Sequence, residues 1–465
     1  THDLQRALDE FLDGQPVSIP ETIASGCLIT RHQQASSDQR VTYAQHIAPI
    51  LQRHCVECHQ PGRSGPMSLT DCDDVVGWAA MIDEVVEQGR MPPWHADRQF
   101  GVFANDPSLE AREKELLHQW IAEGCPRGDT ATKEQLATPG GGEWAIGKPD
   151  VIVSMPHVFN VPATGIVEYQ YFTVDPGFTE DQWVSAVEIR PSNRRVVHHC
   201  NIFLCPPGMS DVAAAGDLGS VCLAAMAAGT RPTFLPTGMA KKIPAGWQIR
   251  FVVHYVSDGT EQTDRTQLGL RLADRDSVTR EVATRLMVDY DLRIPPGDDN
   301  YRVEHSATCE RDSLLLAMFP HMHLRGKSFT YEAEYPDGHR ETLLSVPRWD
   351  FDWQHRYELA EPKMLPAGTV LRCIATYDNS SANPANPDPT VWVRTGERSD
   401  DEMFNAYYDV APVDAGHPAS DRRHRRMLLV AATCVVAIVL AKVCVRRSGN
   451  HRGAESRRKH RGNRE

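Results

Sequence analysis

The sequence lacks several features that mark common classes of protein. Apart from Cys55 and Cys58, its 12 cysteines form no Cys-x-x-Cys pair, which argues against an array of zinc ribbons. No internal sequence repeat is evident. No charged and apolar leader follows Thr1, so we expect a processed or truncated chain. Several other cysteines could form disulfides if the chain is exported.

Composition and charge limit the class of the protein. With 465 residues, of which 41% are hydrophobic and 24% charged, the chain is globular. Its length suits about three domains. The formal net charge of -13 is uneven, because the body is acidic whereas everything after Asp421 is strongly basic. Nucleic-acid binding is therefore a poor interpretation of the body, and a membrane-surface role suits the tail better.

One long apolar run is present, at residues 427–445, and only Lys442 interrupts it. About 19 residues at 1.5 Å each give roughly 28 Å, which just spans a bilayer core; a buried core helix is the alternative. Basic residues flank the run and are denser after it. We therefore expect a linker (413–426), a transmembrane helix, and a cytoplasmic tail (446–465), with the catalytic domains in the periplasm or outside the cell. The flanking residues are Arg422, Arg423, Arg425 and Arg426 before the run, and Arg446, Arg447, Arg452, Arg457, Arg458, Lys459, Arg461 and Arg464 after it.

The segment CVECH, at residues 55–59, combines two thiols with an imidazole. One helical turn can thereby attach a haem through Cys55 and Cys58 and offer His59 as the proximal iron ligand. A redox dithiol or half of a zinc site would explain neither the histidine nor the helical surroundings. Apolar residues recur at helical spacing on both sides of the segment. We therefore predict a small all-α cytochrome c domain with one covalent haem c, covering residues 38–130.

The distal haem ligand is predicted from a loop that follows a helix. Met91 lies in the segment GRMPPWHAD, where Pro92 and Pro93 stiffen the backbone that would present its sulfur. A loop methionine can equally be packing filler. His95 is the alternative ligand.

The region after residue 147 reads as β-structure. A Gly-, Pro- and Thr-rich linker (131–147) precedes it, and segments such as WQIRFVVHYV and LLLAMFPHMHL then follow strand-like patterns. We expect two packed antiparallel β domains in tandem, 148–290 and 291–412, divided near the segment RIPP at 293–296.

The first of these domains has three candidate metal ligands. His198 and His199 are adjacent, and His254 lies in an apolar strand pattern. Neighbouring side chains of a regular strand face opposite ways, so the adjacent pair can share one ion only if the strand bends there. Three neutral imidazoles suit Cu(I) or Cu(II) without strong bias. Any single histidine could instead be a hydrogen-bonded strand residue.

The second domain has a different candidate set. His321 and His323 are two residues apart and so lie on one face of a strand. Met403, after an acidic turn, would add a soft thioether that favours Cu(I), the state that binds dioxygen.

The motifs HHxxxFxC, HY, HxHLxGK and SDDEMxNxY, in this order, resemble those of the copper type II, ascorbate-dependent monooxygenases. This is the family of peptidylglycine α-hydroxylating monooxygenase and dopamine β-monooxygenase, and the resemblance covers residues 149–412. It implies two β-sandwich (jelly-roll-like) copper domains and two copper ions. An electron-storing copper would be held by His198, His199 and His254, and a catalytic copper by His321, His323 and Met403.

The resemblance also bears on the substrate and on disulfides. Phe319 stands where the peptide-hydroxylating relatives have an arginine that binds the substrate carboxylate, which argues against a carboxylate-terminated peptide. Asn405 and Tyr407 match positions that line the substrate cleft of relatives, so they are candidate substrate contacts. Cys205 matches a family disulfide cysteine with Cys222 as its expected partner, Phe404 replaces another family cysteine, and Cys309 with Cys373 is an alternative pair.

The order of domains extends the resemblance. A haem domain fused in front resembles uncharacterised bacterial members of the family, and residues 1–37 resemble the end of a redoxin domain. We therefore expect a copper-dependent monooxygenase that uses dioxygen to hydroxylate or oxidise a small organic substrate. The haem would deliver electrons to the coppers, with ascorbate as a further candidate reductant and an upstream electron donor as partner. The alternative is a non-catalytic periplasmic haem and copper electron-transfer protein.

Overall fold

The structure is a computed structural model of the chain. It describes residues 40–413 except 62, 64, 129–143, 210–220 and 228, together with Glu10, Leu12, Asp13 and Val17. The predicted transmembrane helix (427–445) and tail (446–465) lie outside the described residues, as does nearly all of the redoxin-like segment. Within the described part, no helix is both long and apolar enough to cross a membrane. As predicted, that part is mostly β-sheet with a few short helices.

The chain divides into two compact units, each assembled from several segments. The first, the helical unit, comprises Thr1–Val56, Ser68–Pro92 and Leu109–Ala137. The second, the β unit, comprises Glu57–Met67, Pro93–Ser108 and Thr138–Glu465.

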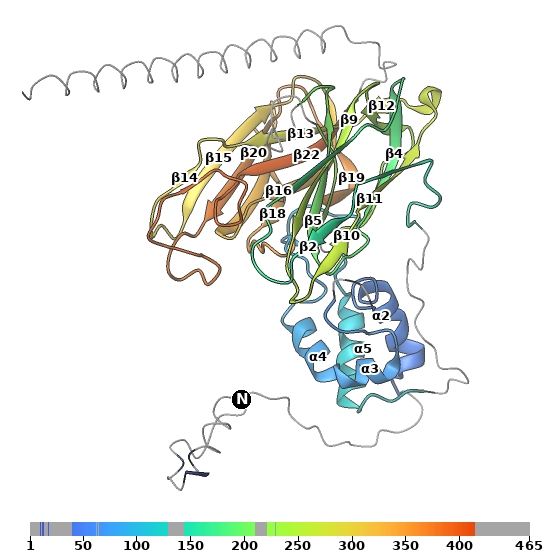
Figure 1. The fold of residues 1–465 in the computed structure, drawn as a ribbon, viewed down its shortest axis with the longest axis vertical. Coiled ribbons are helices and arrows are strands. Elements are labelled where there is room, and N and C mark those ends of the chain that lie inside the picture. The colour runs from blue at the N-terminus through green and yellow to red at the C-terminus, as the bar shows by residue number, and fades with distance from the viewer. Residues whose placement is uncertain are drawn as a thin grey trace, which may run out of the picture. The chain divides into compact units, whose positions relative to one another are not determined.

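The helical unit consists of short helices whose ends are capped locally. At the start of α3, the Asp71 carboxylate accepts a hydrogen bond from the Asp74 backbone N–H at 2.9 Å. At the start of α5, the Glu110 N–H donates to the Glu113 carboxylate at 2.9 Å. Trp120 of α5 is fully buried, and its indole N–H donates to the Pro126 carbonyl at 3.1 Å. The elements are η1 (Tyr43–Ile47), α2 (Ala48–His54), α3 (Cys72–Gly77), α4 (Ala79–Glu87) and α5 (Ala111–Ala122), as Figure 1 shows.

The first half of the β unit is a sandwich. One sheet has the order β1-β11-β4-β8-β12, with β7 paired to β4, and another has the order β3-β9-β5-β6. Val184 and Ile189 of the first sheet share one buried core with Ile202 and Phe251 of the second. The strands are β1 (Val151–Ser154), β2 (Phe159–Val161), β3 (Gln170–Val174), β4 (Gln182–Arg190), β5 (Val197–Cys205), β6 (Val221–Ala227), β7 (Thr233–Phe234), β8 (Met239–Ile243), β9 (Gln248–Tyr255), β10 (Gln262–Asp264), β11 (Gln267–Leu272) and β12 (Arg280–Glu281).

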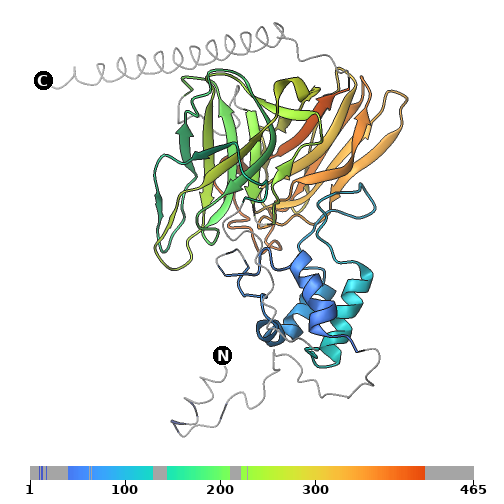
Figure 2. The same ribbon diagram turned by 90° about the vertical axis from the view of Figure 1, so that its right-hand side faces the viewer.

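The second half of the β unit repeats this architecture. Its sheets have the orders β13-β22-β16-β19 and β15-β20-β17-β18, and Leu315 of the first packs in one core with Phe329 and Leu371 of the second. In Figure 2 the two halves form neighbouring stacks of strands, green and orange. The strands are β13 (Ala283–Val288), β14 (Arg293–Ile294), β15 (Tyr301–Thr308), β16 (Ser313–His321), β17 (Gly326–Glu334), β18 (Arg340–Val346), β19 (Tyr357–Leu365), β20 (Val370–Tyr377), β21 (Val393–Arg394) and β22 (Asn405–Pro412).

The segment Pro93–Ser108 belongs to the β unit, although the sequence suggested that it lies within the helical domain. It extends the edge of a sheet at β19, where Phe103 forms an antiparallel bridge with Leu359. The Ala104 N–H donates to the Glu358 carbonyl at 2.8 Å, and the Asn105 amide donates to the Arg356 carbonyl at 2.6 Å. The pairing covers an edge strand that would otherwise expose its backbone groups.

A buried ionic cluster joins the two halves of the β unit. Asp409 of β22 accepts from Lys241 of β8 at 3.1 Å and from Arg356 at 2.8 Å, and the Thr284 hydroxyl donates to it at 2.6 Å. Burial alone would raise the pKa of Asp409, but the two cations hold it well below its ordinary value. The cluster therefore contributes to stability only while Asp409 is ionised.

Asp409→Asn should lower the free energy of unfolding by about 3–5 kcal/mol, because it leaves buried cations uncompensated. The loss should be largest at neutral pH and should shrink as the pH falls below 3.8, the ordinary pKa, towards the lowered value in the folded protein. Urea unfolding at several pH values measures both effects. Glu361→Gln, at an exposed carboxylate, is the matched control. A free energy of unfolding equal to that of the wild type would contradict the role of the cluster.

Candidate metal centre

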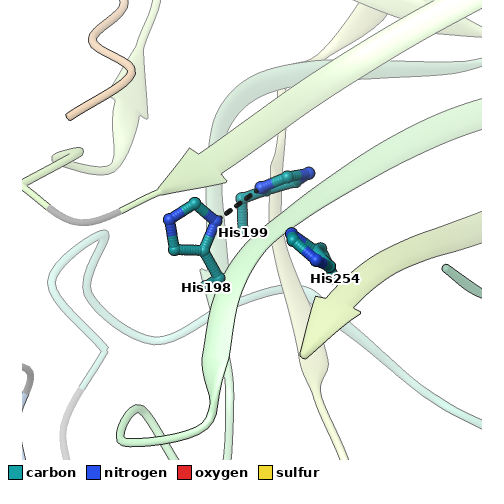
Figure 3. A group of neighbouring side chains, drawn as sticks. All are labelled: His198, His199 and His254. Atoms are coloured by element: carbon teal, nitrogen blue, oxygen red, sulfur yellow. Dashed lines mark hydrogen bonds between the residues drawn. The ribbon is translucent and has the colours of Figure 1, made fainter. Parts of the chain in front are cut away.

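Three histidines converge at one end of the first sandwich. The pairing of β5 with β9 shifts register between Val197 and His199, so that His198 is bulged out of the ladder. This is the bend that the sequence required for adjacent histidines to share an ion. His199 and His254 are direct cross-strand partners. The imidazole nitrogens of the three residues lie within 4.8 Å of one another, and Figure 3 shows the rings gathered between the two strands.

The protonation of these imidazoles suits a metal site. Burial, followed by the neighbouring histidines, lowers the pKa of His199 well below 6.5. The same causes lower the pKa of His254 to about 4. Among the described residues, the buried Nδ1 of His254 has no hydrogen-bond partner. A neutral, buried and unpartnered ring nitrogen is the form in which histidine binds a metal.

Tyr169, which the sequence analysis missed, orients this set. Its hydroxyl is 2.8 Å from Nε2 of His199, and its ring stacks on His254 at 4.9 Å between centroids. The tyrosine thus occupies Nε2 of His199, whose Nδ1 forms a hydrogen bond of 3.0 Å with Nδ1 of His198. A metal bound by both rings would take the place of this hydrogen bond. No spacing in the sequence marks this contact, because Tyr169 lies 29 residues before the first histidine.

The second histidine pair lies at the end of β16. His321 is the last residue of the strand and His323 lies just beyond it, with ring centroids 5.2 Å apart. Nδ1 of His321 is 2.6 Å from the Gln354 side-chain oxygen, and Nδ1 of His323 is 3.3 Å from the Asp401 carbonyl. Each contact leaves Nε2 available. Burial lowers the pKa of His321 to about 4 and that of His323 to about 3.

Glu402 fixes Met403 relative to this pair. Its fully buried carboxylate accepts backbone N–H groups from His323 at 2.8 Å, Arg325 at 2.6 Å and Met403 at 3.1 Å. One carboxylate oxygen therefore holds both the His323 and the Met403 backbone. Met403 Sδ also accepts a hydrogen bond from the Asn405 amide at 3.4 Å, and Asn405 is the cross-strand partner of His321.

The two histidine sets are neighbours, although the sequence assigns them to different β domains. The rings of His199 and His321 have centroids 6.2 Å apart. Phe351 lies against both sets, stacked on His198 at 5.2 Å and edge-on to His323 at 6.0 Å. Five imidazoles thus occupy one buried region where the two halves of the β unit meet.

The candidate substrate residues lie along the same strands. Phe319 of β16 and Tyr407 of β22 are cross-strand partners whose rings stack at 5.8 Å. Both line a cavity at the junction of the two halves, together with Lys241 and Arg356. Because Phe319 and His321 are two residues apart, they lie on one face of the strand. Phe319 thus lines the cavity on the same strand, β16, that ends at His321.

The predicted disulfides are not formed in the structure. Cys205 of β5 and Cys222 of β6 pack in one apolar cluster, but they are thiols, as are Cys309 and Cys373. Burial raises the pKa of the Cys222 thiol to about 12. The pairings remain predictions about the oxidised protein.

The haem-type motif is divided between the units. Cys55 is the C-cap of α2 in the helical unit, whereas Cys58 and His59 belong to the β unit. His59 is buried, with Nδ1 3.3 Å from the Met67 carbonyl, which leaves Nε2 available as a ligand atom. A side chain at Gly65 would come within 2.7 Å of that ring, so only glycine fits there.

The two candidate distal ligands lie in different units. Met91 follows α4 in the helical unit, where its N–H donates to the Val85 carbonyl at 3.1 Å. His95 is in the β unit, with its ring centroid 6.3 Å from that of His355.

No protein-family model matches the chain, and no curated protein matches it. Solved structures that it is similar to include VP2 of infectious bursal disease virus (9% identity, 59% of this chain and 75% of that chain, TM-score 0.20). Others are the major capsid protein P2 of bacteriophage PM2 (8%, 56% and 97%, TM-score 0.21) and PNGF-II (11%, 56% and 65%, TM-score 0.26). TM-scores this low support no statement about fold or function.

The lowered histidine pKa values predict acid sensitivity of the metal-free protein. Below pH 6.5 the unfolded chain takes up protons on these residues, whereas His254 and His321 stay neutral in the folded protein down to about pH 4. Stability should therefore fall between pH 6.5 and 4, by about 1.4 kcal/mol per pH unit for each such histidine. Urea unfolding across this range measures the slope.

His321→Gln should reduce that slope by one histidine's share, and His339→Gln, at an exposed ring, should leave it unchanged. Equal slopes for the wild type and His321→Gln would show that the buried imidazole does not control the pH dependence.

Proposed function

We propose that the chain is a copper-dependent monooxygenase that uses dioxygen to hydroxylate or oxidise a small organic substrate. The observation that carries the proposal is the convergence of three imidazoles, two of them buried, next to a second imidazole pair. The sequence resemblance to the copper type II monooxygenases predicts both sets. In this proposal the two halves of the β unit are the jelly-roll-like copper domains.

The donor atoms fit copper. His198, His199 and His254 would hold one ion through nitrogen, and His321, His323 and Met403 would hold the other through two nitrogens and a thioether. When bound, copper supplies one-electron redox chemistry with dioxygen. The protein's own part is to set the ligands and their access. Tyr169 and Gln354 orient one imidazole in each set, and Phe351 packs against both sets.

The cavity beside Phe319 and Tyr407 is the proposed substrate site, with Asn405 as a further contact. Its aromatic pair suits an apolar portion of a small molecule. Phe319 cannot bind a carboxylate as arginine does, which supports a substrate other than a carboxylate-terminated peptide.

The helical unit, with the segment around His59, is the proposed cytochrome c domain. Cys55 and Cys58 would attach the haem, His59 would be the proximal ligand, and Met91 the distal one, with His95 as the alternative. The contact of His59 Nδ1 with the Met67 carbonyl supports this role, because it fixes the tautomer and ring orientation of an axial ligand. Haem supplies one-electron transfer, so this domain would deliver electrons to the copper sites, alongside or in place of ascorbate.

The proposed location is the periplasmic or extracellular face of a membrane, anchored by residues 427–445. An upstream electron donor is the expected protein partner. The greater density of basic residues after the apolar run supports this orientation.

The purified protein should bind two copper ions per chain and consume dioxygen in proportion to product. Met403→Ala should abolish this turnover, because the second site loses its soft ligand, while the copper of the all-histidine site stays bound. Elemental analysis and the Cu(II) electron paramagnetic resonance spectrum report the metals, and an oxygen electrode reports turnover. Met364→Ala, at an exposed methionine, is the matched control.

Two outcomes would contradict this assignment. Full activity of Met403→Ala would show that the methionine is not a ligand of the second copper. Two bound coppers with no dioxygen consumption across amines, alcohols and amides would favour the electron-transfer alternative.

The polypeptide should also retain one haem after denaturation and extraction of free haem, because the two thioether bonds are covalent. The absorption spectrum of the denatured chain measures this. Replacing both Cys55 and Cys58 by Ser should abolish the retained band, whereas Cys72→Ser should not. Complete loss of haem from the wild-type chain on extraction would refute the cytochrome assignment.

A further inference from the structure

A segment that follows the predicted haem ligand is fixed onto the β unit. Trp94 lies three residues after Met91 in the sequence and opens the stretch that pairs with β19. The Asp97 N–H donates to the Ser345 carbonyl at 2.8 Å, and Asn105 both donates to Arg356 and accepts from the Glu358 N–H at 3.0 Å. The segment is therefore anchored to the β unit at two points that follow Trp94.

Trp94 contacts a buried histidine that neither histidine set includes. Its ring centroid is 5.5 Å from that of His355 and 4.9 Å from that of Tyr357. His355 is 4% exposed, and among the described residues its Nε2 has no hydrogen-bond partner. Burial, and then the nearby His95, lowers the pKa of His355 to about 4, so the ring stays neutral.

His355 is linked through its neighbour in the chain to a candidate copper ligand. The preceding residue, Gln354, places its side-chain oxygen 2.6 Å from Nδ1 of His321. From the Trp94 ring to the His321 ring, the route consists of one ring contact, the covalent chain between two neighbouring residues, and one hydrogen bond. The route thus begins at Trp94, three residues after Met91 in the sequence, and it ends at His321, a candidate copper ligand.

We propose that Trp94 and His355 form the route by which electrons pass from the haem-bearing part of the chain to His321. This inference rests on the proposed function, and it names the residues that would carry the electrons. With both groups bound, each passage would oxidise the haem iron by one electron and reduce the copper at the second site by one electron. No proton needs to move, because the His355 ring is neutral before and after.

The alternative role for Trp94 is packing alone, and the same cluster offers a matched control. Phe103 is on the same docked segment as Trp94. Its ring centroid is 5.9 Å from that of Trp94 and 5.5 Å from that of Tyr357. Phe103→Leu removes aromatic packing from the cluster but leaves the contact between Trp94 and His355. Trp94→Leu removes that contact, and Trp94→Phe keeps an aromatic ring in its place.

The test uses the full chain loaded with haem and Cu(II), without dioxygen. A laser flash on a photoreducible flavin delivers one electron to the haem, and the absorbance of the haem then reports its reoxidation while the Cu(II) resonance signal decreases. The fast reoxidation phase should be lost in Trp94→Leu and in His355→Leu, and kept in Trp94→Phe and Phe103→Leu. The haem reduction potential and the copper content of all four variants should match those of the wild type.

The outcomes separate this inference from the function on which it rests. If the wild type shows no haem reoxidation linked to loss of Cu(II), the haem does not serve the copper sites and the proposed function fails in that part. If the wild type shows this linked reoxidation, and the haem of both Trp94→Leu and His355→Leu is reoxidised as fast as that of the wild type, only the route is wrong. Equal slowing in Phe103→Leu would assign Trp94 to packing and would also overturn the route.

Discussion

The structure depends on keeping four buried imidazoles neutral and close together, next to a fifth, that of His198. A charged imidazole is costly to bury, so dense packing favours the unprotonated rings that a metal requires. Each ring then needs a partner for one nitrogen while the other stays available. Tyr169, Gln354 and the Asp401 carbonyl meet this need for three of the rings. The bulge at His198 brings two neighbouring residues of one strand to the same place.

The second half of the site depends on a buried carboxylate. Burial raises the pKa of Glu402 to about 7, while hydrogen bonds from three backbone N–H groups and the charge of Arg325 act in the opposite direction. These bonds join the turn after β16 to the segment before β22. His323 and Met403, 80 residues apart in the sequence, are thereby held by the same side chain. The backbone N–H groups replace the hydrogen bonds to water that the Glu402 carboxylate loses on burial, and so they offset the cost of its desolvation.

The sequence was sufficient to predict those features of the molecule that depend on local sequence patterns. The predominance of β-structure and the presence of a few helices were predicted correctly, because alternation and helical spacing are local properties. The need for a bend at His198 also followed from strand geometry alone. Tyr169, Phe351 and Gln354 could not be found in this way, because their roles arise from contacts between segments far apart in the chain. The docking of Phe103 on Leu359 is of the same kind, since a loop with prolines carries no periodic signal of its distant partner.

The loop between β18 and β19 contacts both histidine sets as well as the docked segment. Phe351 packs on His198 and His323, Gln354 binds His321, and His355 lies against Trp94. A displacement of this loop would therefore alter the partners of both sets together. An aromatic ring between the sets has no hydrogen bond to offer water, so it lowers the polarity of the region and strengthens the electrostatic interactions there. A polar side chain at position 351 would admit water between the sets and weaken the bias towards neutral imidazoles on which the whole arrangement depends.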